Sequence, residues 1–154
     1  MRRQPTSNHC FICGRQNPVG LKMEFHSAGS GEVVAEYTVP DVYQGYPGVV
    51  HGGVTAAILD ETAGRSVMTD DDEQRFFVTL KLETRYRRQV PTGTPLRILG
   101  HLKDLRGRRA VVHSEIRLPD GTVAAEAEAV LVELQPHMLQ AVDTEALGWG
   151  VRDT

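Results

Sequence analysis

The sequence has few cysteines and no long apolar run. Only two cysteines occur among 154 residues, so a disulfide framework is not expected. No stretch approaches the roughly 20 consecutive apolar residues that a membrane-spanning helix needs. The basic N-terminus, MRRQPTSNHC, is not followed by the apolar core of a secretory signal peptide. We therefore expect a cytoplasmic protein with no membrane partner.

The chain also lacks an excess of charge, internal repeats and low-complexity segments. Its formal net charge is −3, with 24% charged and 40% hydrophobic residues, which are ordinary values for a globular protein. This balance gives no reason to expect a nucleic-acid partner. A length of 154 residues suits one domain with one core.

Strand-like segments dominate what is present. LKMEFH (21–26) and GEVVAEYTV (31–39) are a predicted strand pair, and a loop at 40–48 follows. The last strands are joined by tight turns, so we expect antiparallel neighbours. The later predicted strands are residues 75–88, 94–105, 108–118 and 122–134. Side chains alternate between the two faces of a strand, so residues 75–88 divide into two sets. One face would carry Leu80, Leu82, Thr84 and Tyr86, and the opposite face would carry Thr79, Lys81, Glu83 and Arg85.

One long helix is predicted at residues 51–68, before the run of strands. A long helix followed by an antiparallel sheet indicates an α+β domain. We expect an N-terminal loop segment at 1–20, the domain at 21–134, and a tail at 135–154 with a short helix near 137–147.

Two adjacent acids of the predicted helix fall on different faces. Glu61 stands one turn before Arg65, which predicts a solvent-exposed ion pair. Asp60 lies about 100° away, on a face of small or apolar residues: Ala56, Ala57, Ala63, Gly64 and Val67. A carboxylate on a face that packs against a sheet needs hydrogen-bond partners or a function. A structural role, in which Asp60 accepts hydrogen bonds that hold loops together, is the alternative.

The predicted helix begins with the sequence His51-Gly52-Gly53. The first backbone N–H groups of a helix have no intrahelical acceptor and lie at the positive end of the helix dipole. Glycine lets a ligand approach these groups closely. Such donors can bind an anion or polarise a carbonyl whose oxygen gains charge in a transition state. The alternative is a flexible entry to the helix with a capping glycine.

Two stretches resemble a known family. PGVVHGGVTAAILDE resembles the central-helix signature of hotdog-fold acyl-CoA thioesterases of the 4-hydroxybenzoyl-CoA and phenylacetyl-CoA type. HCFICGRQNPVGLKMEF is similar to an N-terminal signature of one branch of that superfamily, and the resemblance covers roughly residues 9–134. It implies a hotdog fold, with a long central helix wrapped by an antiparallel sheet. It also implies hydrolysis of an acyl-CoA thioester to a carboxylic acid and free CoA, without a metal or a further cofactor.

The resemblance assigns catalytic roles to four residues: Asp60, Gly52, Thr79 and His51, the last of which would help place the thioester. Asp60 would be the catalytic carboxylate, acting as nucleophile or as general base on water. The Gly52 N–H would polarise the thioester carbonyl. Thr79 falls where such enzymes often carry a Ser or Thr that orients water or the carboxylate, normally supplied by the partner subunit.

Substrate positions follow from the same resemblance. His51 and Gly53 would place the thioester at the helix mouth. Gln44 matches a polar position of some members, although it lies seven residues before His51 and theirs lies one nearer. The family forms dimers with composite sites, commonly paired into tetramers. We expect at least a homodimer here, because an open sheet edge invites pairing and the last strand carries alternating small residues: Ala125, Ala127 and Ala129.

Two groups of arginines are candidates for the CoA phosphates, which arginine contacts through bidentate hydrogen bonds. The alternative is a charged solvent face and a hairpin tip. The candidates are Arg85, Arg87 and Arg88, together with Arg106, Arg108 and Arg109 of the turn RGRR.

The N-terminal stretch HCxxC raises the question of zinc. His9, Cys10, Cys13 and His26 are possible ligands. One CxxC with no second pair is weak evidence for a zinc site. We therefore expect no metal and favour a packing role for the cysteines, with zinc and redox chemistry as the alternatives.

Two other functions compete with hydrolysis. A non-catalytic acyl-CoA binder or sensor could use the same scaffold, but a regulator would normally add a DNA-binding segment, and only about twenty loop-like residues with no basic helix precede the domain. A hydratase would carry other histidine-centred motifs. The sequence does not identify the acyl group, since Phe76 and Phe77 suit an aromatic acyl site or the core equally.

Overall fold

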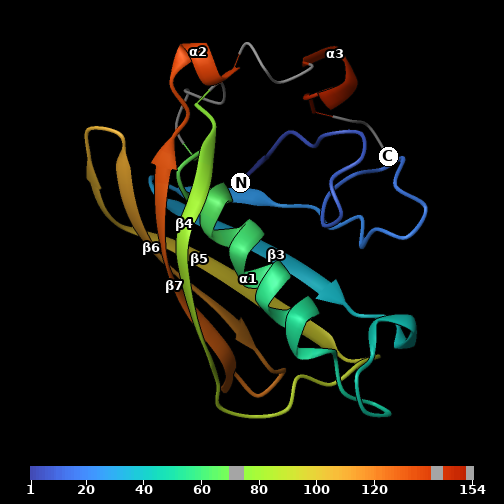
Figure 1. The fold of residues 1–154 in the computed structure, drawn as a ribbon. Helices are drawn as coiled ribbons and strands as arrows, with labels where there is room; N and C mark the ends of the chain where they lie inside the picture. The colour runs from blue at the N-terminus through green and yellow to red at the C-terminus, as the bar shows by residue number, and fades with distance from the viewer. Residues whose placement is uncertain (70–74, 140–143, 152–154) are drawn as a thin grey trace.

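The computed structural model describes residues 1–69, 75–139 and 144–151. The elements in chain order are β1 (Arg2–Arg3), β2 (His26–Gly29), β3 (Glu32–Thr38), the 3-10 helix η1 (Asp41–Tyr43), α1 (Gly52–Ser66), β4 (Phe77–Tyr86), β5 (Pro95–Arg106), β6 (Arg109–Arg117), β7 (Val123–Glu133), α2 (Pro136–Leu139) and α3 (Thr144–Leu147). The strands form one sheet in the order β1-β2-β3-β5-β6-β7-β4, and every pairing is antiparallel (Figure 1).

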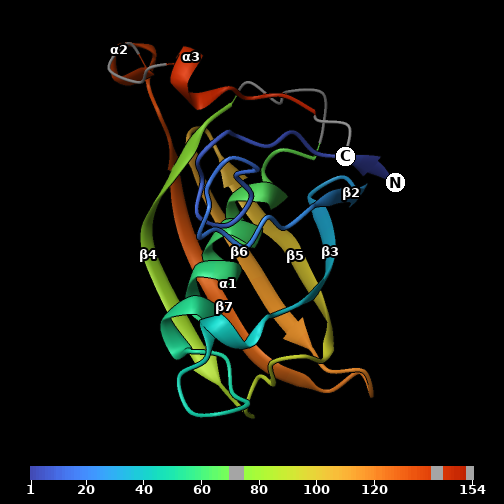
Figure 2. The same cartoon turned by 90° about the vertical axis from the view of Figure 1, so that its right-hand side faces the viewer.

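Helix α1 lies against one face of this sheet and contacts strands β3 to β7 (Figure 2). Ile58 and Leu59 of α1 are completely buried in the core. The sheet offers small residues where the helix approaches most closely. A Cβ atom at Gly100 of β5 would lie 2.3 Å from the Ser66 hydroxyl, so only glycine fits there.

The alternating alanines of β7 serve this helix–sheet packing. Ala125 and Ala129 have no exposed surface and Ala127 has 2% within a single chain. Strand β7 is also an interior strand, paired with β6 and β4. The prediction that these alanines indicate a subunit contact is therefore wrong. The open edge beside them belongs to β4.

The predicted helix and the later strands are confirmed, and β5, β6 and β7 are antiparallel neighbours as expected. The strand predicted at 21–26 is wrong for 21–25, because β2 begins at His26. Leu21 and Met23 donate backbone hydrogen bonds to Phe11 and Ile12 of the N-terminal segment, at 2.8 Å each. The tail contains α2 and α3, while residues 140–143 of the predicted tail helix lie outside the described residues.

The alternation predicted along 75–88 is confirmed from Lys81 to Tyr86 but is wrong for Thr79 and Leu80, because β4 contains a bulge between Thr79 and Lys81. Thr79 pairs with Leu131 of β7 and Lys81 pairs with the next residue, Val130. The extra residue, Leu80, reverses the alternation at this point. Thr79 therefore faces α1, on the same side as Tyr86, which contacts the helix start.

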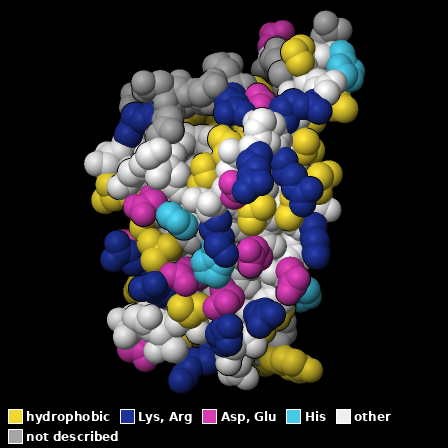
Figure 3. Space-filling model, turned by 90° about the vertical axis from the view of Figure 1, so that its left-hand side faces the viewer, with side chains coloured by type: hydrophobic (Ala, Val, Ile, Leu, Met, Phe, Trp, Pro, Cys, Tyr) yellow, Lys and Arg dark blue, Asp and Glu magenta, His cyan; other side chains and the backbone are white. Residues whose placement is uncertain are grey.

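The other face of the sheet carries charges of both signs. Lys103 pairs with Glu128 at 3.2 Å, and Arg117 pairs with Glu115 at 2.6 Å. Figure 3 shows basic, acidic and histidine side chains interspersed on this side of the molecule. Among the described residues, no helix is both long enough and apolar enough to span a membrane.

Candidate active site

The start of α1 presents an unused backbone donor at Gly52. His51 is the N-cap, and its Nδ1 accepts the Gly53 N–H at 2.9 Å. The Gly53 N–H is therefore already hydrogen-bonded to His51, so it does not serve as a free donor to a substrate. Gly52 N–H has no acceptor among the described residues. A helix N-terminus concentrates positive potential at such a group.

The two glycines have different steric surroundings. A Cβ at Gly53 would lie 3.1 Å from the His51 ring, so a side chain there would displace the cap. A Cβ at Gly52 would meet only ordinary contacts, the nearest being Tyr86 Oη at 3.7 Å. A methyl group would therefore fit at Gly52, which is exposed at the start of the helix.

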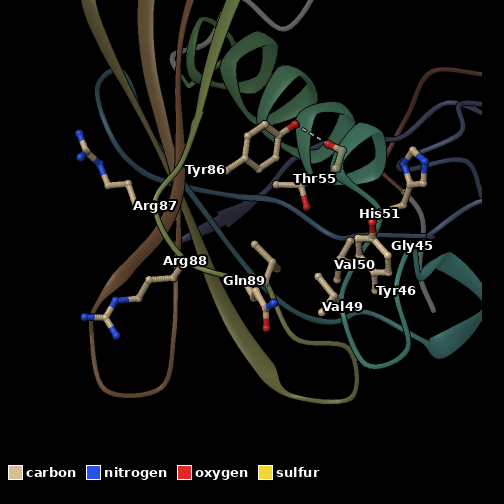
Figure 4. Close-up of a pocket in the computed structure, with 12 residues that line it drawn as sticks. Gly45, Tyr46, Val49, Val50, His51, Thr55, Tyr86, Arg87, Arg88 and Gln89 are labelled. Carbon is tan, nitrogen blue, oxygen red and sulfur yellow. Dashed lines mark hydrogen bonds between the residues drawn. The ribbon is translucent and has the colours of Figure 1, made fainter.

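A pocket of about 780 Å³ opens at this helix start. Its lining comes from the loop before α1, the first turn of α1 and the end of β4: Gly45, Tyr46, Val49, Val50, His51, Gly52, Thr55, Tyr86, Arg87, Arg88, Gln89 and Val90. Tyr86 donates its hydroxyl to the Gly52 carbonyl at 2.6 Å, which fixes β4 to the helix (Figure 4). The sequence contained no local signal for this role of Tyr86, because the contact joins residues 34 positions apart.

Asp60 lies further along α1, where the helix faces the first half of β4. Thr79 donates its hydroxyl to Asp60 Oδ1 at 2.6 Å. The half-buried carboxylate lines a second cavity of about 280 Å³ with Thr79, Glu61, Cys10 and other residues. Both partners belong to one chain, so the expectation that the partner subunit supplies Thr79 to Asp60 is wrong. The bulge in β4 brings the hydroxyl to the helix side.

Gly52 and Asp60 are therefore separated within one chain. They are eight positions apart in α1, which corresponds to about 12 Å along a helix that rises 1.5 Å per residue. The two groups also line different cavities. The carbonyl of one thioester cannot contact both groups of the same chain.

The arginine candidates divide between two ends of the sheet. Arg85 pairs in register with Glu126 of β7, and Arg109 pairs with Val132, so β7 separates them by about 20 Å. Arg87 binds Glu126 through two hydrogen bonds of 2.9 and 3.1 Å. Arg88 lines the pocket at the helix start and forms no ion pair with the described residues. Figure 4 shows both guanidinium groups directed away from Tyr86 and Thr55.

The remaining candidates of this kind are placed outside the pocket. Arg85 lies 3.7 Å from Glu83, and Arg106 lies 3.1 Å from Asp104. Arg108 lies in the exposed β5–β6 turn, and the exposed Arg109 begins β6. Gln44 accepts the Gly48 N–H at 3.3 Å, so its side chain serves its own loop. The structure therefore brings Arg87 and Arg88 to the helix start and leaves the others away from it.

Glu61 is not the solvent-exposed residue that the helical projection predicted. The predicted ion pair with Arg65 exists, at 3.1 Å, but the Arg65 side chain is only 1% exposed. The N-terminal segment and the C-terminal tail cover it: Arg65 donates to the Pro5 carbonyl and lies over the rings of Phe25 and Trp149. The projection placed the two residues correctly on one face but could not show that the N-terminal segment covers that face.

The two cysteines lie at the same place. Cys10 Sγ is 3.8 Å from Glu61 Oε2 and accepts the N–H groups of Ile12 and Cys13 at 3.3 and 3.4 Å. These donors, above all the Cys13 thiol, lower the pKa of Cys10 to about 6. The pKa of Cys13 is raised, because its proton is held by the Cys10 sulfur and because the residue is buried. His9 is exposed and takes no part in this cluster.

Comparisons with known proteins match this arrangement to one family. The sequence model of the thioesterase superfamily matches residues 47–125, which include α1 and β4 to β6. Mouse acyl-coenzyme A thioesterase THEM4 is 30% identical over 95 residues, covering 61% of this chain and 40% of that protein. The Xenopus laevis THEM4 is 25% identical over 123 residues, covering 79% and 54%. The chain thus spans about half, or less, of the length of these relatives.

Solved structures agree with these matches. A thioesterase superfamily protein is 32% identical with a TM-score of 0.72, over 81% of this chain and 63% of that one. A hypothetical thioesterase from Streptococcus pneumoniae, determined with coenzyme A, is 21% identical with a TM-score of 0.66, over 73% and 85%. These likenesses confirm the hotdog fold that the sequence implied.

Proposed function

Because this chain belongs to the thioesterase superfamily, we propose that it hydrolyses an acyl-CoA thioester to a carboxylic acid and free CoA. One observation carries the proposal: Asp60, half-buried in a cavity, is held by the Thr79 hydroxyl at 2.6 Å. A carboxylate fixed in this way can act on water or on a carbonyl carbon. The names of the curated relatives support the same reaction.

In the proposed mechanism, the Gly52 N–H donates to the thioester carbonyl oxygen. Negative charge grows on this oxygen when the carbonyl carbon is attacked, and a preorganised donor stabilises it. Asp60 either takes a proton from the attacking water or attacks the carbon itself, forming an anhydride that water then cleaves. In both routes the C–S bond breaks, CoA leaves as the thiol, and the acyl group leaves as the acid. These groups suffice without a metal or a redox cofactor.

The separation of Gly52 from Asp60 leads us to a composite site in a homodimer. One thioester contacts both groups if one chain supplies the Gly52 N–H and a second copy supplies Asp60 with Thr79. Strand β4 is the available edge, because it ends the sheet and its Val78 and Leu80 are 42% and 63% exposed. Unpaired edge strands readily pair with another chain. A pairing of two such dimers, as the family resemblance implies, is the larger assembly that we propose.

We assign the CoA phosphates to the end of β4. Arg88 is the strongest candidate, because it lines the pocket at the helix start and forms no ion pair within the part of the chain that the structure describes. Arg87 is a weaker one, since Glu126 already binds its guanidinium. An acyl-CoA with its carbonyl at Gly52 would extend its nucleotide along this arginine-bearing edge.

The proposal is tested by a screen of short, medium, long and aromatic acyl-CoAs, with release of the CoA thiol as the readout. We expect hydrolysis of at least one class at a rate well above the uncatalysed one. Measurable acyl-CoA binding without hydrolysis of any class would instead identify a binder or sensor. Prolonged treatment with a chelator should leave hydrolysis unchanged.

A further inference from the structure

We propose that Cys10, Cys13 and Glu61 form a zinc site that fastens the N-terminal segment to helix α1. Their three ligand atoms lie within 4.8 Å of one another. For a tetrahedral zinc with bonds of about 2.3 Å to sulfur and 2.0–2.2 Å to oxygen, neighbouring ligand atoms stand about 3.5–3.8 Å apart. The Cys10 Sγ to Glu61 Oε2 distance of 3.8 Å matches this spacing. The inference is independent of the proposed hydrolysis.

The loop that carries the cysteines is shaped to present thiolates. Ile12 and Cys13 direct their N–H groups at Cys10 Sγ, and hydrogen bonds to sulfur favour the thiolate that a metal binds. Gly14 closes the turn by donating to the Cys10 carbonyl at 2.8 Å. A Cβ at Gly14 would lie 2.5 Å from Cys10 backbone atoms, so the sequence C-x-x-C-G is required by the turn itself.

The carboxylate ligand is oriented by a neighbour. Arg65 Nε donates to Glu61 Oε1 at 3.1 Å, which leaves Oε2 toward the cysteines. Such a partner is what metal-ligating carboxylates ordinarily have. As metal ligands, two thiolates and one carboxylate would carry three negative charges, and Arg65 would offset one of them. A divalent cation would bring the cluster to neutrality.

The donor set selects the cation. Two soft thiolates favour zinc over magnesium or calcium, which take oxygen ligands. Three protein ligands leave the fourth position of zinc toward the cavity that Cys10, Cys13 and Glu61 share with Asp60. The metal would fasten the N-terminal segment to α1 at Glu61 and would take no part in the chemistry at Asp60.

The test uses the full chain, made metal-free and then titrated with zinc chloride. We expect one zinc per chain, and cobalt(II) in its place should give thiolate charge-transfer and tetrahedral absorption bands. Glu61→Gln should weaken zinc binding at least tenfold. Asp60→Asn, which changes the adjacent acid in the same cavity, should bind zinc as the wild type does. Zinc should raise the melting temperature of the wild type and leave that of a Cys10→Ser, Cys13→Ser variant unchanged.

A second measurement does not depend on variants that fold poorly. Titrating the native, zinc-loaded wild type with a mercurial reagent should release one zinc per two thiols, measured with a chromogenic chelator. The proposal is overturned if the wild type binds no zinc, if Glu61→Gln binds it equally well, or if cobalt shows no thiolate band. Conversion of the thiols to an internal disulfide with zinc present would also overturn it. None of these readouts uses hydrolysis, so either proposal can fail while the other stands.

Discussion

At the residue scale, a substitution at Gly52 should lower catalysis without lowering the stability of the fold. A methyl group at position 52 would make only ordinary contacts with Tyr86, and alanine favours a helix more than glycine does. The free energy of unfolding of Gly52→Ala should therefore equal that of the wild type or exceed it by up to about 1 kcal/mol. The methyl group would occupy the space beside the N–H that meets the carbonyl. We expect kcat/KM to fall at least about tenfold, which equals about 1.4 kcal/mol of transition-state binding.

Thermal or urea unfolding and steady-state kinetics on the same preparation check this prediction. Gly53→Ala is the matched control, because its methyl group would displace the His51 cap and should lower stability instead. Equal kcat/KM in Gly52→Ala and wild type would mean that the carbonyl does not lie at Gly52.

Arg88 should act on binding of the nucleotide and not on the chemical step. The nucleotide is remote from the reacting carbonyl, so its contacts are similar in the ground state and the transition state. Arg88→Ala should raise KM for acyl-CoA more than it lowers kcat, and more strongly at low salt. Arg117→Ala, which breaks the pair with Glu115 at 2.6 Å elsewhere on the sheet, is the control. An equal loss with a short thioester that lacks the nucleotide would refute the assignment.

Single residues were predictable from the sequence where the helix decides their position. The helical projection separated Asp60 from Glu61, and the two glycines stand at the exposed start of the helix. Thr79 was assigned to the wrong face, because a bulge is a feature of strand pairing that leaves no mark in a single strand. The partial burial of Glu61 was not predictable, because Cys10, which contacts it, lies 51 positions away in the chain.

At the element scale, the N-terminal segment is held by an acid-sensitive ion cluster. Burial raises the pKa of Glu24, whereas Arg15 and Arg3 lower it. The two arginines together outweigh burial, so the pKa of Glu24 lies below its ordinary value of 4.5. A carboxylate with a lowered pKa stabilises the fold above its ordinary pKa. That contribution is lost as the pH falls through the lowered value. Below pH 4.5 the segment should therefore detach more readily.

The variant Glu24→Gln measures this contribution. At about pH 7 it should lower the free energy of unfolding by about 0.5–1 kcal/mol, since the group is partly exposed. The difference between wild type and variant should shrink toward zero in acid. Urea unfolding of both proteins across the pH range checks this, and a difference that stays constant with pH would contradict it.

The elements themselves were largely predictable. The strands that became β5, β6 and β7 and the helix that became α1 have apolar patterns long enough to identify them. Residues 21–25 show what an apolar pattern leaves undetermined. Their alternating burial is real, with Leu21, Met23 and Phe25 inside. A periodic pattern reveals burial, but it does not reveal whether the hydrogen-bond partner is a strand or a loop.

At the scale of the whole molecule, the open edge of β4 should be the subunit contact. Leu80, at the bulge, is 63% exposed in the single chain. Leu80→Glu would place a charge in the proposed interface, where leaving it unpaired is costly. Sedimentation at micromolar concentration should show a dimer or larger for wild type and a monomer for the variant. Hydrolysis should be lost with the dimer, because Gly52 and Asp60 of one chain are too far apart.

Leu105→Glu is the control for this prediction, since Leu105 is 39% exposed and lies on β5, away from the β4 edge. It should remain a dimer and remain active. A wild-type protein that is monomeric and active would refute the composite site.

The order of the strands was not predictable from the sequence. Tight turns gave β5, β6 and β7 as neighbours, but β4 lies beside β7 and β3 lies beside β5. Both pairings join segments that are distant in the chain, and a single sequence holds no signal for them. The position of the open edge, and therefore of the proposed dimer contact, follows only from the structure.

The central claim is that Asp60 carries the hydrolysis, and Asp60→Asn tests it most directly. The substitution keeps the shape of the side chain and an oxygen for the Thr79 hydroxyl, while it removes the basic carboxylate. Asp104→Asn, at an exposed acid paired with Arg106, is the control. On the best acyl-CoA of the screen, we predict that Asp60→Asn binds as wild type does and loses at least about a hundredfold in kcat. Hydrolysis by Asp60→Asn at the wild-type rate would contradict the account.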